Sequence, residues 1–421
     1  MSILRINGGR ALNGEVRIQG AKNSVLPIMA ASILAEGVSI IHNCPRLADV
    51  DVSARILEHL GCKVSRDGES VCIDSSGMIR SDIPDALMRE MRSSVVFLGA
   101  ILARTGEARL SLPGGCELGP RPIDLHIAAL RELGAEIDDN GGKIVCKAKR
   151  LKGCRLHLAK PSVGATENAM LAACRSSGTT VITNPAKEPE IWDLQAYLIK
   201  LGVSISGAGS SIITVESMPT KNHVEHTVIS DRIVAATYLS AVASAGGSIR
   251  LTDVNPEHLS TAIDVLNEMG CEIEADREKG IITARKEKRL KAVKPVITSP
   301  YPGFPTDTQP PVMAACLKAQ GTTVFVENIF ENRYRHVEEL KRLGAEIKTE
   351  GKTAIICGVD RLHGAELQST DLRGGAALCV AALGAEGISE ISGLHHIDRG
   401  YDKIENALQA LGADIRRTSG A

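Results

Sequence analysis

The sequence predicts a mixed α/β protein of two lobes, each built from three copies of one β-α-β-α-β-β unit. Three observations predict this fold: a helix-ending pattern that recurs six times, a second set of apolar helices that alternates with it, and short β-branched strands between them. Self-similarity at a regular spacing indicates a repeat architecture.

The recurring pattern is a charged helix that ends on Gly and runs into a strand. Its copies read ILEHLGCKV, ALRELGAEI, YLIKLGVSI, VLNEMGCEI, ELKRLGAEI and ALQALGADI. Their glycines lie 68 to 74 residues apart, at Gly61, Gly134, Gly202, Gly270, Gly344 and Gly412. Glycine at this place fits a left-handed helix C-cap. These helices keep a charged face, so we expect them on the outside of each lobe.

The alternating helices are rich in Ala, Leu and Val and carry few charges. They read NSVLPIMAASILAEG, SSVVFLGAILARTG, ATENAMLAACRSSG, RIVAATYLSAVASAG, QPPVMAACLKAQG and GGAALCVAALGAEG. A helix that is apolar all round is buried. Strands such as TTVIT and TTVFV lie between the helices, and a hairpin-like pair of strands follows each charged helix, as in AEIDDNGGKIVCKA.

The two ends of the chain suggest how the lobes close. The sixth copy stops at ADIRRTSGA, before its last strand, and the first 21 residues hold strands without a helix. We expect the N-terminal strands to complete the last unit, with residues 22–229 in one lobe and residues 1–21 and 230–421 in the other. A cleft between two such lobes is a usual ligand site. A linear solenoid fits less well, because polar capping units are missing.

The composition argues against several classes of protein. The 421 residues carry a net charge of −1 and only 2% are aromatic, which disfavours nucleic-acid binding and membrane-interface belts. No apolar run has the length of a signal peptide or a membrane span, so we expect a cytoplasmic protein. Eleven cysteines without a CxxC pair disfavour disulfides and zinc. His395 and His396, interpreted as strand neighbours facing opposite sides, would not share a metal. The oligomeric state stays open.

One loop breaks the symmetry of the repeats. The interval between the Gly that ends an inner helix and the Gly that ends the next outer helix is 28 residues in the second copy and 23 to 25 in the others. The extra residues fall in LPGGCELGPRPID, which holds a Gly pair, Cys116 and Arg121. This loop is typical of a mobile lid with a reactive thiol. An isolated Cys is more often inert, and the loop does not distinguish a nucleophile from a proton donor.

Cations mark the beginnings of the inner helices. They are Lys22, Arg92, Lys160, Arg232 and Arg373. A cation opposes the helix dipole there, which makes sense if an anion docks at the exposed N–H groups. The simpler alternative is pairing with solvent or a carboxylate. The fifth copy has Asp307 instead, a candidate general base or an N-cap. Arg333 and Arg399 lie in loops that correspond to the Cys116 loop, where they would complete an anion cage.

These residues resemble the UDP-N-acetylglucosamine 1-carboxyvinyltransferase family. The matching stretches run from about residue 19 to 415: GAKNSVLPIMAASILAEG, PGGCELGPRPIDLH, KPSVGATENAM, SDR at 230–232, PGFPTD, FENRYRHVEELKRLGAEI, TDLRGG and HIDRGYDKIENALQALGA. The resemblance implies two inside-out α/β lobes of three repeats each. It also implies transfer of an enolpyruvyl group from phosphoenolpyruvate to the 3′-hydroxyl of UDP-N-acetylglucosamine, without a metal or an organic cofactor.

The resemblance implies roles for individual residues. Cys116 matches a lid cysteine that donates a proton and can form an adduct with phosphoenolpyruvate, and Asp307 matches the base for the sugar hydroxyl. Lys22 and Asn23 match the pair beside both substrates. The remaining matches are substrate-binding residues: Arg92, Arg121, Pro122, Ile123, Asp124, Leu125, Lys160, Ser162, Val163, Gly164, Ile329, Arg333, Asp371, Arg373 and Arg399. The alternatives are a non-catalytic paralogue that binds a nucleotide sugar, and the shikimate-pathway enolpyruvyl transferase, which lacks the PGGC lid.

Overall fold

The computed structural model describes residues 2–111, 123–139, 141–216 and 218–419. Its internal contacts divide it into two compact units. The first unit comprises the described residues from Gly20 to Ile229, and the second unit those up to Gln19 and from Ser230 onward. Each unit has its own hydrophobic core.

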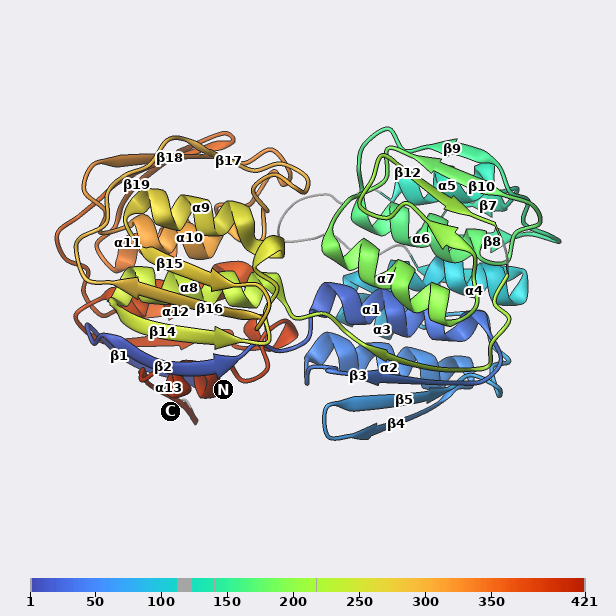
Figure 1. Ribbon diagram of the computed structural model, residues 1–421, viewed down its shortest axis with the longest axis horizontal. Helices are drawn as coiled ribbons and strands as arrows, with labels where there is room; N and C mark the ends of the chain where they lie inside the picture. The colour runs from blue at the N-terminus through green and yellow to red at the C-terminus, as the bar shows by residue number, and fades with distance from the viewer. Residues whose placement is uncertain (1, 112–122, 140, 217, 420–421) are drawn as a thin grey trace. The chain divides into compact units, whose positions relative to one another are not determined.

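The first unit contains helices and strands in the order that the repeats predict (Figure 1). Its helices are α1 (Lys22–Ala31), η1 (Ser32–Leu34), α2 (Ala48–Leu60), α3 (Asp85–Glu90), η2 (Arg92–Val96), α4 (Phe97–Thr105), α5 (Asp124–Glu132), α6 (Val163–Ala173) and α7 (Pro189–Lys200). Its strands are β3 (Val38–His42), β4 (Lys63–Asp67), β5 (Ser70–Asp74), β6 (Glu107–Ser111), β7 (Glu136–Asp138), β8 (Lys143–Lys147), β9 (Arg155–His157), β10 (Thr180–Thr183), β11 (Ile205–Ser206), β12 (Ile212–Val215) and β13 (His223–Thr227). In the described range they form sheets of order β13-β3-β5-β4, β6-β8-β7 and β11-β12-β10-β9.

The second unit repeats this plan. Its helices are α8 (Arg232–Ala245), η3 (Pro256–Leu259), α9 (Ser260–Met269), α10 (Gln309–Cys316), α11 (Val337–Arg342), α12 (Leu372–Gly384), η4 (Ile397–Arg399) and α13 (Ile404–Ala410). Its strands are β1 (Ser2–Gly8), β2 (Leu12–Arg17), β14 (Gly247–Thr252), β15 (Glu272–Asp276), β16 (Ile281–Lys286), β17 (Val296–Ile297), β18 (Thr322–Val326), β19 (Glu346–Glu350), β20 (Thr353–Cys357), β21 (Glu366–Gln368), β22 (Gly387–Ser392) and β23 (Asp414–Ser419). The sheets are β15-β16-β14-β2, β17-β18-β20-β19 and β21-β22-β1-β23.

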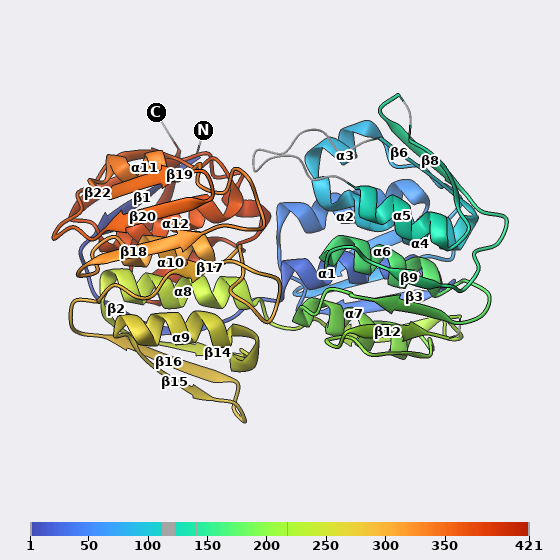
Figure 2. The ribbon, with the colours of Figure 1, turned by 90° about the horizontal axis from the view of Figure 1, so that it is seen from above.

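The inner helices are buried, as the sequence predicts. Nearly every residue of α1, α8, α10 and α12 is inaccessible, and α4 and α6 are buried over most of their length. In the second unit α8, α10 and α12 pack against one another, with sheets around them (Figures 1 and 2). Helix α10 accommodates two prolines because Pro310 and Pro311 lie in its first turn, where backbone N–H groups have no partner within the helix.

The outer helices end on left-handed glycines. The six glycines of the recurring pattern have φ between 87° and 103°, a region that favours residues without a Cβ. The chain then turns into the strand that follows, and an antiparallel partner completes the hairpin, as in β4–β5 and β19–β20. The predicted C-caps and hairpins are therefore confirmed.

The two N-terminal strands belong to different sheets. Strand β1 lies antiparallel between β22 and β23, with Leu4 opposite Ile391 and Arg417, so it completes the sixth unit as predicted. Strand β2 does not complete that unit. It pairs in parallel with β14 of the fourth unit, at the edge that β17 and β21 occupy in the neighbouring sheets. The expectation that both strands complete the last unit is therefore wrong for β2.

The chain crosses from one unit to the other twice. The two segments at these crossings are hydrogen-bonded to each other. The Ala21 N–H donates to the Ile229 carbonyl at 2.7 Å, and the Asp231 N–H donates to the Gln19 carbonyl at 2.8 Å. Over the described residues, no helix combines the length and apolar character that crossing a bilayer requires.

Candidate active site

In the second unit, two of the inner helices begin with an acidic cap followed by a cation. The Asp231 carboxylate accepts from the N–H groups of Ile233 and Val234, and the buried Arg232 is the first residue of α8. The Asp371 carboxylate likewise accepts from the N–H groups of Arg373 and Gly374 at 3.1 and 2.9 Å. An acid at the N-cap satisfies orphan donors of the first turn and so sets where the helix begins.

Asp307, just before α10, lies between two buried arginines. Arg333 Nη2 donates to Asp307 Oδ1 at 3.0 Å, and Arg373 Nε lies 3.5 Å from Oδ2. The arginine side chains are 1% and 2% exposed, whereas that of Asp307 is 29% exposed. The two guanidinium groups balance the charge of the carboxylate, and its exposure leaves it open to a ligand. A partly exposed carboxylate can accept a hydrogen bond from a substrate hydroxyl, which is the contact that a general base requires.

Arg333 is fixed by its own backbone contacts. Its Nε and Nη2 donate to the Thr306 carbonyl at 3.1 and 2.8 Å, and Nη1 lies 3.9 Å from Asp371 Oδ1. The planar guanidinium is thus held at several points, which aims it at Asp307. The structure places Arg333 behind the carboxylate, buried from solvent.

Glu327 ties the loop after β18 to the same region, a contact that sequence reasoning missed. Its Oε1 accepts from the N–H groups of Ile329 and Phe330 at 2.8 and 3.1 Å, and its Oε2 accepts from the Thr306 hydroxyl at 3.0 Å. The Ile329 side chain is left 41% exposed. A buried carboxylate therefore holds this predicted nucleotide-sugar contact near Asp307.

Two further buried residues of this region were missed, although both lie in the quoted motifs. Tyr401, two positions after Arg399, has its ring centroid 5.5 Å from the Arg373 guanidinium carbon. His336, three positions after Arg333, is fully buried beside Asp371 and Arg333, and burial lowers its pKa to about 4. Arg399 itself is half-buried at the end of η4. The available signal was an aromatic ring two or three positions after an arginine of each motif.

In the first unit, Lys22 opens α1 and contacts a carboxylate. Its Nζ lies 2.7 Å from Asp49 Oδ2, and the two side chains are 9% and 2% exposed. Asn23 is half-buried beside it, and Arg92 is a half-buried first residue of η2. Asp49 lies in RLADVD and was not singled out from the sequence. Lys22 therefore pairs with a neighbouring carboxylate in this structure, and its role beside the substrates stays a prediction.

Two stretches of the predicted nucleotide-sugar site meet in the first unit. Ile123, Asp124 and Leu125 lead into α5, whereas Ser162 caps α6 by accepting from the Ala165 N–H at 3.4 Å. His126 joins them, because its Nδ1 lies 2.9 Å from Asn168 Nδ2 and a Cβ on Gly164 would fall 2.9 Å from its Cε1. Val163 opens α6, and Lys160 is exposed before it. Glycine at 164 thus permits the close approach of the two helix starts.

The remaining predictions concern three residues that the structure does not describe and a pair of histidines. Cys116, Arg121 and Pro122 lie outside the described residues. His395 and His396 lie in a turn with ring centroids 4.0 Å apart, so the interpretation that placed them on opposite faces of a strand is wrong. Within the described ranges, no group of three or more His, Cys, Asp or Glu side chains is arranged to hold a metal ion.

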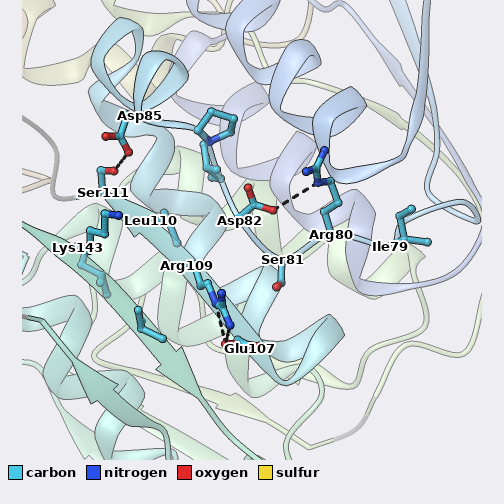
Figure 3. A pocket seen from close by; sticks show the side chains of 14 residues that line it. Ile79, Arg80, Ser81, Asp82, Asp85, Glu107, Arg109, Leu110, Ser111 and Lys143 are labelled. Atoms are coloured by element: carbon cyan, nitrogen blue, oxygen red, sulfur yellow. Dashed lines mark hydrogen bonds and ion pairs between the residues drawn. The ribbon is translucent and has the colours of Figure 1, made fainter.

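A groove of about 850 Å³ lies along β6 and β8 of the first unit, and none of the predicted site residues that the structure describes lines it (Figure 3). Its charges face one another. Arg109 Nη2 lies 2.8 Å from Glu107, Arg80 Nε lies 3.5 Å from Asp82, and the Ser111 hydroxyl donates to Asp85. Because most of its charges are paired internally, we assign it no ligand.

Comparisons with known proteins agree on one family. Residues 6–408 match the family EPSP synthase (3-phosphoshikimate 1-carboxyvinyltransferase). UDP-N-acetylglucosamine 1-carboxyvinyltransferase 2 of Caldanaerobacter subterraneus subsp. tengcongensis is 52% identical, over 99% of this chain and all of that protein. UDP-N-acetylglucosamine 1-carboxyvinyltransferase of Myxococcus xanthus is 45% identical over 99% of each chain.

Solved structures give the same fold. The enolpyruvyl transferase NikO from Streptomyces tendae superposes with a TM-score of 0.89 at 28% identity, covering 100% of this chain and 99% of that one. EPSP synthase from Acinetobacter baumannii superposes over both full chains with a TM-score of 0.75 at 20% identity, which bears on the fold alone. The predicted two-lobe inside-out α/β fold is therefore confirmed.

Proposed function

Because the chain belongs to the UDP-N-acetylglucosamine 1-carboxyvinyltransferase family, we propose that it transfers the enolpyruvyl group of phosphoenolpyruvate to the 3′-hydroxyl of UDP-N-acetylglucosamine and releases phosphate. This reaction is the first committed step of peptidoglycan synthesis, and we place it in the cytoplasm. The observation that carries the proposal is the partly exposed Asp307 carboxylate between two buried arginines.

The proposed reaction is an addition followed by an elimination. The 3′-oxygen forms a bond to C2 of phosphoenolpyruvate while a proton adds to C3, and Asp307 accepts the hydroxyl proton. The C2–O bond to phosphate then breaks and C3 loses a proton, which restores the double bond. Electrons stay within the two substrates, so the reaction needs neither a metal nor an organic cofactor.

We assign roles to the remaining residues according to the charge that develops on the substrates during the reaction. Cys116 is the proposed proton donor to C3, and Lys22, Arg121 and Arg399 offset the negative charge of the tetrahedral intermediate. The stretches 123–125 and 162–164, with Arg92, Lys160 and Ile329, bind the nucleotide sugar. Support for this last assignment is the direct packing of the two stretches through His126.

Phosphate release with both substrates tests the proposal. The wild-type protein is expected to release phosphate only when both substrates are present, and Cys116→Ala and Asp307→Ala should each lower the rate by about 100-fold or more. The matched controls are Cys357→Ala, at an exposed thiol, and Asp360→Ala, at an exposed carboxylate of the second unit. Both controls should keep the wild-type rate.

Several outcomes would reject the proposal. Equal rates in the wild type and both site variants would remove the assigned chemistry. Binding of UDP-N-acetylglucosamine by calorimetry without phosphate release would identify a non-catalytic paralogue. Turnover with shikimate 3-phosphate instead of the nucleotide sugar, unaffected by a thiol reagent, would identify the shikimate-pathway activity.

A further inference from the structure

Tyr401 lies where three site-bearing segments of the second unit meet. The side chain is 1% exposed, follows Arg399 by two residues, and packs against Arg373 of α12. Its hydroxyl lies 2.8 Å from Thr237 Oγ1 of α8. One phenol therefore contacts both helices whose N-termini carry cations in this unit.

The direction of each hydrogen bond follows from Thr237. The Thr237 hydroxyl donates its proton to the Ile233 carbonyl at 2.8 Å, so its oxygen accepts in the pair with Tyr401. Burial raises the pKa of Tyr401 although Arg373 lowers it, and the phenol keeps its proton to donate. The hydroxyl is thereby anchored to α8, and it holds the Tyr401 ring in place beside Arg373, whose guanidinium carbon lies 5.5 Å from the ring centroid.

The resulting chain of contacts ends at the proposed base through an ion pair. Arg373 is 2% exposed and its Nε lies 3.5 Å from Asp307 Oδ2. A guanidinium is rigid and planar, so a ring packed beside it also limits where its nitrogens point. Without the hydrogen bond to Thr237, the ring would lose its anchor and Arg373 would lose the surface that holds it in this orientation.

We propose that Tyr401 is a positioning residue, which holds the Arg373 guanidinium against Asp307 during the reaction. This inference rests on the proposed function. Tyr401 is 1% exposed and lies beside Arg373, so the proposed effect on the reaction passes through Arg373.

The test is a matched pair of Tyr→Phe substitutions. Tyr401→Phe removes one buried hydroxyl and keeps the ring beside Arg373. Tyr197→Phe makes the same change in the first unit, where the fully buried hydroxyl lies 2.7 Å from the Oγ of Ser39, a residue outside the predicted site. Both variants should lose similar thermal stability, because each loses one buried hydrogen bond.

The kinetic constants should separate the two variants. We expect Tyr401→Phe to lower kcat about tenfold with little change in either KM, because the positioned group acts on the base. Tyr197→Phe should keep wild-type constants. If Tyr401→Phe matches Tyr197→Phe in kcat and both KM values, the positioning role is refuted. Should Tyr401→Phe fail to fold, Thr237→Val decides: a fall in kcat of about threefold supports the role, and an unchanged kcat refutes it.

A crystal structure of the Tyr401→Phe protein keeps this inference separable from the proposed function. It should show Arg373 turned away from Asp307, and an unchanged Nε–Oδ2 contact would refute the inference even in an inactive protein. A wild type that releases no phosphate would instead refute the proposed function alone.

Discussion

At the scale of single residues, buried charges of the second unit occur in compensating sets. Arg333 and Arg373 are almost inaccessible, and each contacts a carboxylate of Asp307 or Asp371. Removing one member of such a set leaves an uncompensated buried charge, which costs far more than a surface pair contributes. Asp307, at 29% exposed, is the most accessible member of the set, and the surrounding charges hold it in one geometry.

His126 makes stability depend on pH. Burial lowers its pKa from 6.5 to about 4. Between these values the unfolded chain binds a proton that the folded protein does not, so the free energy of unfolding falls as the pH falls through this window. The full shift corresponds to roughly 3 kcal/mol. The buried His336 acts in the same direction.

Substituting His126→Gln should remove part of this dependence. The wild type should lose about 2 kcal/mol more than the variant between pH 7.5 and pH 5, because only the wild type has the extra proton to expel on folding. Urea unfolding at the two pH values measures this difference. His157→Gln, at an exposed side chain, is the control and should behave as the wild type. Parallel losses in the wild type and His126→Gln would contradict the prediction.

At the scale of helices and strands, one buried carboxylate joins α1, α7 and β13. Asp193 of α7 accepts from the Ser24 hydroxyl and, at 3.2 Å, from the Ile229 N–H, and lies 2.8 Å from His226 Nε2. Asp193, Ser24 and His226 are each at most 4% exposed. This carboxylate therefore attaches the start of α1, with Lys22 and Asn23, to the segment where the chain leaves the first unit.

Asp193→Ala should destabilise the first unit by roughly 3–5 kcal/mol, because it leaves buried donors without their acceptor. Denaturant unfolding measures the loss. Asp360→Ala, at a side chain 86% exposed, should change stability by less than about 0.5 kcal/mol. Equal midpoints for the two variants would show that Asp193 does not hold these elements together.

The same scale explains which features were predictable from sequence. The outer-helix caps at Gly61 and its repeats, and the apolar inner helices, depend on local pattern, so the sequence predicts them. Asp307 was predictable because it interrupts a row of cations. Its partners were not all predictable: Tyr401 and Glu327 act through contacts between distant segments, which no spacing reveals. The expected position of β2 was wrong for a similar reason. The sequence does not show which sheet has the edge strand beside which β2 pairs.

At the scale of the whole molecule, each unit closes its sheets with its own strands. In the first unit, β13 returns to pair with β3, so residues 20–229 contain every strand of its described sheets. The second unit depends on residues before Gly20, because β1 separates β22 from β23 and β2 covers β14. Each unit also has a separate apolar core. Independent cores favour independent folding.

Three chains test whether the units fold separately. Residues 20–229 alone should unfold cooperatively on heating, followed by circular dichroism. Residues 230–421 alone should not, since without β1 the buried Ile391 and Ile415 lose the strand between them. Residues 1–19 joined through a short glycine linker to residues 230–421 should restore a cooperative transition. The Asp231 N–H already bonds the Gln19 carbonyl, so the junction spans neighbouring backbone. A cooperative transition in 230–421 alone, as sharp as in the joined chain, would show that β1 is dispensable for that core.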